Sequence, residues 1–160
     1  MSEQVVVGVG NPTMSDDGVG HRIVDALEKS DDCPERVDLH RTATSSFLAL
    51  EALSGADRAV VVDAIDVPDT RPGTVHRYQI TDGTPEAGAP DVLMHDLSFS
   101  HALQAGREAY DIPPDITVIG VQPACVSIGL DLSDPVTAAV STAVDAVLDA
   151  LDAAETATEP

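Results

Sequence analysis

Three acids and one histidine supply the chemistry that this sequence can perform. Asp16 and Asp17 follow a glycine-rich turn, Asp63 ends an apolar run, and His95 precedes a predicted helix. Two carboxylates and an imidazole form a mixed oxygen and nitrogen set that suits a divalent cation of intermediate softness. The same groups serve as general acids and bases. The sequence therefore predicts a site formed by Asp17, Asp63 and His95.

The predicted elements explain why these residues, distant in sequence, would meet. Residues 5–9 form a β-branched run that ends in Gly10 and Asn11, and residues 59–64 form a second buried strand. Ligands of an open α/β sheet bind outside the carboxyl ends of its strands. We therefore expect Asp17, after the first strand, to lie near Asp63 at the end of another.

Each residue also has an ordinary structural interpretation. Asp16 or Asp17 would cap the helix that follows, since acids favour helix N-termini. Asp63 would close an Asx turn, and His95 would be a surface histidine. We assign no site role to the other histidines: His21, His40, His76 and His101. Cys125 is expected to be buried packing, because no histidine is arranged to activate it.

The turn after the first strand does not fit a nucleotide. Gly8 and Gly10 match two positions of the dinucleotide fingerprint, but Thr13 stands at the third. Two carboxylates at the helix start would also repel a phosphate. A P-loop is excluded, because Lys29 is the only lysine and is not part of such a motif.

Strand and helix patterns alternate along the chain. Further strands are predicted at residues 37–41, 74–80 and 116–121, and residues 81–90 read as an irregular loop. Helices are predicted over 17–29, from the caps Thr44, Ser45 and Ser46 to Leu53, after Ser98, and from Pro135 onward, with one apolar face on the last. Apolar runs in the strands indicate a parallel sheet covered on both faces. We predict one domain over residues 1–160, a three-layer α/β/α sandwich around a mostly parallel sheet of about five strands, with a frayed tail at 153–160.

Charge and composition restrict the partners and the compartment. The chain has 28 acids against 8 bases, a net charge of −20, which disfavours nucleic acid and anionic membranes. No run of about 18 apolar residues suggests a membrane span. The acids are spread along the chain, which we interpret as adaptation to high salt. Cys33 and Cys125 form no CxxC motif, so we expect a cytoplasmic protein with two unpaired thiols.

Four segments together resemble one enzyme family. They are GVGNPTMSDDGVG (8–20), VVVDAID (60–66) with PGTV (72–75), MHDLSFSHAL (94–103) and IGVQP to GLDLSDPV (119–136). In this order they look like the hydrogenase maturation peptidases. That family removes a C-terminal peptide from the large subunit of nickel–iron hydrogenase after nickel insertion.

The resemblance implies specific roles for the matched residues. The family's metal-contacting residues fall on Asp17, Asp63 and His95, and Gly10 and Asn11 match the loop that shapes its pocket. It implies an endopeptidase of the aspartic type that recognises nickel carried by the hydrogenase large-subunit precursor, while other divalent cations can occupy the isolated site. We expect a monomer. Either metal-bound water or a carboxylate would be the base.

Two other functions remain open at the level of sequence. One is a non-proteolytic metal-binding scaffold or accessory protein of metallocentre assembly that uses the same three ligands. The other is an α/β ligand-binding domain in which the acids are only helix caps.

Overall fold

The computed structural model describes residues 3–90, 93–94 and 97–158 of the chain. Its main sheet has the order β2-β1-β3-β8-β4-β5, and the first four of these strands run parallel to one another. β4 pairs antiparallel with β8, and β5 antiparallel with β4. The strands are β1 (Gln4–Val9), β2 (Val37–Thr42), β3 (Arg58–Ala64), β4 (Val75–Thr81), β5 (Thr84–Pro85) and β8 (Asp115–Val121).

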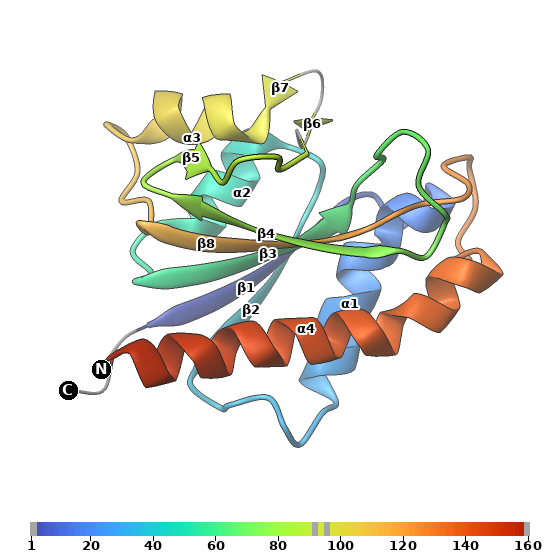
Figure 1. Ribbon diagram of the computed structural model, residues 1–160, viewed down its shortest axis with the longest axis horizontal. Coiled ribbons are helices and arrows are strands. Elements are labelled where there is room, and N and C mark those ends of the chain that lie inside the picture. Colours follow the sequence, from blue (N-terminus) through green and yellow to red (C-terminus); the bar gives the residue numbers. More distant parts are fainter. Residues whose placement is uncertain (1–2, 91–92, 95–96, 159–160) are drawn as a thin grey trace.

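Helices cover both faces of this sheet. A 3₁₀ turn, Ser15–Gly18, leads into α1 (Val19–Glu28), and the other helices are α2 (Ser46–Leu53), α3 (Phe99–Gly106) and α4 (Asp134–Thr158). α1 and α4 lie on one face, and α2 and α3 on the other (Figure 1). β6 (Leu93–Met94) and β7 (Leu97–Ser98) form a separate two-stranded sheet. The predicted three-layer α/β/α sandwich is confirmed.

The apolar strands explain the two layers of core. Val5, Val7 and Val9 face the α2 and α3 side, whereas Val6 faces α1 and α4. Because successive side chains of a strand point to opposite faces, an all-valine strand can fill two cores at once. The helix predicted after Ser98 is also confirmed as α3, which buries Phe99, Ala102, Leu103 and Gly106.

The path of the chain changes direction beside β1. α1 connects β1 to β2 across one face, and α2 connects β2 to β3 across the other. This change of direction makes the carboxyl ends of β1 and β3 the topological switch point of the sheet, where ligands of such folds bind.

Close approach of α1 to the sheet depends on glycine. A Cβ atom on Gly20 would lie 2.5 Å from the Val62 carbonyl oxygen and 2.7 Å from that of Val9. Any side chain there would push α1 away from β1 and β3. The 3₁₀ turn that carries Asp16 and Asp17 would move with it.

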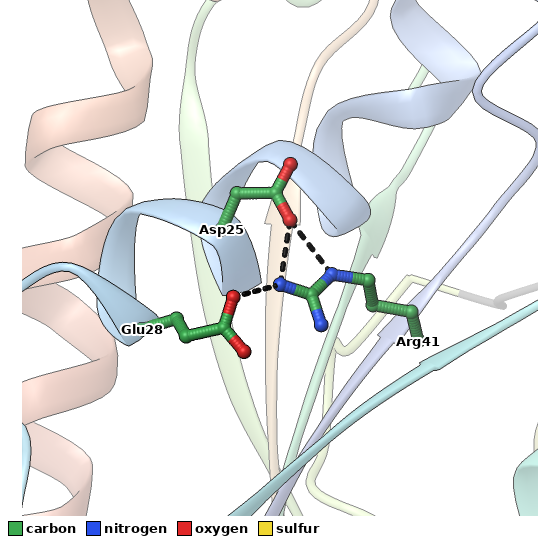
Figure 2. A network of polar contacts seen from close by, with 3 residues as sticks. All are labelled: Asp25, Glu28 and Arg41. Carbon is green, nitrogen blue, oxygen red and sulfur yellow. Dashed lines mark hydrogen bonds and ion pairs between the residues drawn. The ribbon is translucent and has the colours of Figure 1, made fainter.

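An ion-pair network joins the other end of α1 to β2. Arg41 of β2 donates from Nε to Asp25 Oδ1 at 2.7 Å and from Nη2 to Glu28 Oε2 at 2.8 Å (Figure 2). The three side chains are partly exposed, so the network contributes modestly to stability. It fixes the outer end of α1, while Gly20 permits the close contact at the inner end.

Several predicted boundaries differ from the structure. The main sheet has six strands, and the loop predicted at 81–90 contains β5. The helix predicted from Asp17 begins as a 3₁₀ turn and becomes α-helical only at Val19. The tail expected from residue 153 is wrong for residues 153–158, because α4 continues to Thr158. Across the described residues, no helix combines the length and apolar character needed to cross a membrane.

Candidate active site

Asp17 lies at the switch point, on the loop that leaves β1. Its Oδ2 accepts a hydrogen bond of 2.9 Å from the backbone N–H of Asn11. Thr44, which follows β2, lies at the limit of hydrogen-bond distance, with its Oγ1 3.5 Å from the same oxygen. The carboxylate of Asp17 is therefore oriented by the loops after β1 and β2.

Asp63 is buried at the end of β3, with 3% of its surface exposed. Its Oδ1 accepts a 2.8 Å hydrogen bond from the N–H of the next residue, Ala64. The predicted Asx turn is wrong, because the N–H of Ile65, two residues on, bonds the Val121 carbonyl instead. Burial raises the pKa of Asp63 well above the ordinary value, and the nearby negative charge of Asp17 raises it further, while the Ala64 hydrogen bond opposes both effects. Asp63 therefore holds a proton more readily than an exposed aspartate does.

Gly10 and Asn11 shape the space between these two acids. Gly10 has a φ of +144°, and a Cβ atom there would overlap the carbonyl oxygen of Asp17 and lie 3.8 Å from Asp63 Oδ1. Asn11 points its own side-chain oxygen at Thr13, accepting from the Thr13 N–H at 2.9 Å and from its hydroxyl at 2.6 Å. Gly10 thus provides room, and Asn11 provides a backbone N–H and a fixed turn.

Two neighbouring carboxylates in this setting favour a cation. When both carboxyl groups are ionised, two like charges lie side by side, and one of them is buried. Without a cation this arrangement has a high free energy. A divalent cation would relieve that repulsion, and carboxylate oxygens are suitable ligands for it. No group of three or more potential metal ligands occurs within the described residues. A cation bound by Asp17 and Asp63 would need ligands in addition to these two carboxylates.

Asp16 has a different role from its neighbour. It is fully buried, and its carboxylate accepts hydrogen bonds from the backbone N–H groups of Ala124, Cys125 and Ser133 and from the Ser133 hydroxyl, at 2.7–2.9 Å. Burial alone would raise the pKa of Asp16, but these hydrogen bonds outweigh it and hold the pKa below its ordinary value. Asp16 anchors the segment 124–133 to the loop that carries Asp17.

The interpretation of Asp16 or Asp17 as a helix cap is wrong. Neither the 3₁₀ turn nor α1 has a side-chain hydrogen bond at its N-cap. Ser45 is the N-cap residue of α2 but also makes no side-chain cap bond. The Thr44 hydroxyl, which we expected at that cap, points toward Asp17 instead.

His95 lies outside the described residues, so its position relative to Asp17 and Asp63 stays a prediction. His101 is exposed on α3, as expected for a residue outside the site. His21 is closer to the site than we predicted. Its Nε2 lies 2.8 Å from the carbonyl oxygen of Thr42, which also accepts the N–H of Gly10 at 3.1 Å. Since a carbonyl only accepts, Nε2 carries the proton, and His21 helps hold the Gly10 turn against β2.

Gln122 is a further positioning residue that the sequence did not reveal. It is buried directly after β8, accepts from the Val67 N–H and donates to Asp66 Oδ1, both at 2.8 Å. It thereby fixes the segment that follows Asp63. The only feature of the sequence that could have indicated this role is the position of Gln122, a polar residue immediately after an apolar strand.

The two cysteines are free, as predicted, but Cys125 is exposed and not buried as expected. Its thiol lies 3.0 Å from the Ser127 hydroxyl, and this contact lowers the pKa of Cys125. Burial raises the pKa of Cys33.

Comparisons with known proteins agree on one family. A family model described as HycI, hydrogenase maturation protease, matches residues 21–150. The hydrogenase 2 maturation protease of Escherichia coli strain K12 is 29% identical over 147 residues, which cover 92% of this chain and 89% of that protein. The hydrogenase expression/formation protein HupD of Rhizobium leguminosarum bv. viciae is 30% identical over 148 residues, covering 91% of this chain and 70% of that protein.

The chain belongs to the hydrogenase maturation protease family. A solved structure of the hydrogenase maturating endopeptidase HybD from E. coli supports this at the level of the fold. It has a TM-score of 0.80 at 27% identity, with 95% of this chain and 93% of that chain covered. Membership of this family makes the chain a peptidase, and the resemblance drawn from the four sequence segments is confirmed.

Proposed function

We propose that this peptidase removes the C-terminal extension of a nickel-loaded hydrogenase large-subunit precursor. The relatives named above are maturation proteins of hydrogenase. The observation that carries the proposal is the pair formed by Asp17 and buried Asp63, whose mutual repulsion a cation would relieve. Nickel belongs to the substrate in this reaction, and the enzyme needs no resident metal. Other divalent cations would also be able to occupy the site of the isolated protein.

In this proposal Asp17, Asp63 and His95 complete the coordination of the precursor's nickel. Asp17 is oriented by the Asn11 N–H, which leaves a carboxylate oxygen available for the cation. Binding a cation would favour the ionised form of Asp63 and so oppose the burial and repulsion that raise its pKa. The scissile bond would then be held beside the nickel and these carboxylates, and either a carboxylate or metal-bound water would act as the base.

The direct test is incubation of purified enzyme with nickel-loaded precursor, followed by mass spectrometry of the precursor. We expect a shortened large subunit, and no cleavage of the same precursor without nickel. A precursor that binds but stays intact would instead support a scaffold without peptidase activity. Cleavage of the nickel-free precursor at the same rate would contradict recognition through nickel.

His95 and His101 form a matched pair for testing the third ligand. His95→Ala should reduce processing at least 100-fold, because it removes a proposed nickel ligand. His101→Ala changes an exposed histidine of α3 and should leave processing within about twofold of wild type. If only His101→Ala impaired processing, the assignment of His95 would be wrong.

The proposed setting is the cytoplasm of an organism that lives in high salt, where the enzyme acts as a monomer on its protein substrate. The net charge of −20 and two free thiols support this proposal. Since the Debye length falls to about 3 Å at molar salt, self-repulsion should weaken as KCl is added. We expect the melting temperature to rise between low and molar KCl. A flat or falling profile would contradict the adaptation to high salt.

A further inference from the structure

The segment between β8 and α4 exposes apolar side chains beside the candidate site. Val126, Ile128 and Leu130 are 50%, 90% and 70% exposed, three large apolar residues within five positions. We call this row of three the apolar ridge. Single exposed apolar residues are ordinary on protein surfaces, but a cluster of them marks a surface that meets a partner.

The ridge is held firmly against the loop that carries Asp17. The Ser15 N–H donates to the Gly129 carbonyl at 2.9 Å, and the Gly129 N–H donates to the Thr13 carbonyl at 2.9 Å. The Ser15 hydroxyl donates to the Ser127 carbonyl at 2.7 Å, and Asp16 anchors the segment through its carboxylate. A surface that is ordered before binding loses little conformational entropy when a partner docks.

The ridge also lies beside the site in space. The 122–133 segment passes next to the 3₁₀ turn that precedes α1, at the end of the sheet where the strands β1, β3 and β8 finish (Figure 1). The Asp16 N–H donates to the Cys125 carbonyl at 3.0 Å, and Asp17 is the next residue. A protein chain that reaches Asp17 and Asp63 from this side would contact the ridge.

Three segments near the site carry no charged side chain, whereas the loop after β3 carries Asp66, Asp69 and Arg71. Residues 10–15, 42–48 and 122–130 contain no charged side chain, although 22% of the whole chain is charged. Much of the remaining surface is acidic, so an acidic partner would be repelled almost everywhere else. An uncharged apolar face offers a partner a contact that does not depend on pairing of charges.

A groove continues the ridge along α1 and α4. Arg22 donates to the Leu130 carbonyl at 2.9 Å and lines this groove, which has a volume of about 630 Å³. Its apolar lining is Ala26, Leu132 and Val140, and Asp25, Lys29 and Asp131 also line it. An extended segment of a partner that crosses Leu130 would enter the groove.

We propose that the apolar ridge is the docking surface for the hydrogenase large-subunit precursor, through an uncharged, apolar segment of that protein. This inference rests on the proposed function, because the precursor is its occupant. The ridge binds the substrate away from the reacting atoms, so it contributes to affinity and not to the chemical step.

The test compares two variants that add the same charge at opposite ends of β8. Ile128→Asp/Leu130→Asp changes the ridge. Gln104→Asp/Ala105→Asp changes two exposed residues of α3, at the end of the molecule away from the ridge (Figure 1). Binding of nickel-loaded precursor is measured by fluorescence anisotropy and its cleavage by KM and kcat, all in molar KCl to screen the added charges. The melting temperature of each variant checks its fold.

The ridge variant should raise Kd and KM at least tenfold with kcat within about twofold, and the α3 variant should change each within about twofold. If wild type cleaves the precursor and the ridge variant binds it equally well, the docking surface is wrong while the proposed function stands. If wild type binds the precursor without cleaving it and the ridge variant no longer binds it, the docking surface is supported and the peptidase activity is contradicted. If wild type neither binds nor cleaves the precursor, both proposals fail. A wild-type dimer that the ridge variant converts to monomer would assign the ridge to a second copy of this chain and overturn the inference.

Discussion

Two buried carboxylates lie at the same end of the sheet, and their surroundings are opposite. Asp16 is fully buried and accepts four hydrogen bonds from the segment 124–133. Asp63 is 3% exposed, accepts one hydrogen bond from Ala64 within the described structure, and lies near the charge of Asp17. The pKa of Asp16 is lowered, whereas that of Asp63 is raised.

This difference separates a structural acid from a functional one. Burial disfavours the ionised form of any carboxyl group, and only sufficient hydrogen bonds reverse that effect. Asp16 has these bonds and serves as a fixed anion that holds two loops together. Asp63 has only the hydrogen bond from Ala64 among the described residues, so a bound cation would stabilise its ionised form. Acidity and burial alone do not distinguish the two roles.

The largest effect is expected for Asp63→Asn. Asparagine keeps the acceptor for the Ala64 N–H but removes the charge, so processing of nickel-loaded precursor should fall at least 1000-fold, about 4 kcal/mol in transition-state stabilisation. The free energy of unfolding at pH 7 should stay equal to that of wild type or rise, because a buried, repelled charge is removed. Mass spectrometry and urea denaturation measure the two quantities. Lost processing together with clearly lower stability would mean that Asp63 is a structural acid like Asp16.

Asp16→Asn should give the opposite pattern of stability. Its amide group would face the N–H or O–H donors that now bind a carboxylate oxygen, leaving buried donors unpaired. The expected loss in the free energy of unfolding is about 2–3 kcal/mol. Processing would fall because the loop shifts, and an excess of precursor should restore part of the rate. Unchanged stability would show that the hydrogen bonds from Ala124, Cys125 and Ser133 are not important for the fold.

The two acids should also affect stability at different pH. Since the folded pKa of Asp16 is depressed, its contribution is present above the ordinary aspartate pKa of about 3.9 and is lost as the pH falls further. Asp63 has a raised folded pKa, so its favourable contribution exists below about pH 3.9 and is lost as the pH rises through the folded value. Urea titrations from pH 3 to 8 should therefore show the wild-type advantage over Asp16→Asn shrinking in acid. The advantage of Asp63→Asn over wild type should grow toward neutral pH.

The sequence predicted the position of the site better than the roles of its neighbours. Asp17 and Asp63 could be predicted because strand ends of a parallel sheet converge, and both residues follow apolar strands. Asp16 could not be distinguished from Asp17, since its partners are more than 100 residues away in the chain. The role of Thr44 was missed in a similar way. The local preference of threonine for helix N-caps suggested that it caps α2, but its hydroxyl points toward the carboxylate of Asp17, which is distant in sequence.

In the sheet too, local sequence patterns predicted some strands and missed others. Alternating strand and helix patterns predicted the parallel strands and the two helical layers. β4 is antiparallel because it follows a turn-rich loop and not a helix, and the short strand β5 depends on pairing with β4. Such pairing has little signature in residues 81–90, where glycine and proline predicted only a loop. The exposure of Cys125 was also missed, because Asp16 holds its segment at the surface.

The smallest expected effect tests whether Asp17 and Asp63 act as a pair. Asp17→Asn keeps an oxygen that can accept the Asn11 N–H, so the loop should keep its shape, and the unfolding free energy should change by less than about 1 kcal/mol. Removing the charge of Asp17 should lower the pKa of Asp63, measured by ¹³C NMR titration of its carboxyl carbon, because one of the two causes of its elevation is gone. Thr44→Val is the matched control, since it removes a neighbour 3.5 Å from Asp17 Oδ2 but no charge, and it should leave the pKa of Asp63 unchanged. A pKa of Asp63 that also stays unchanged in Asp17→Asn would mean that burial alone raises it. The argument for a shared cation between the two carboxylates would then fail.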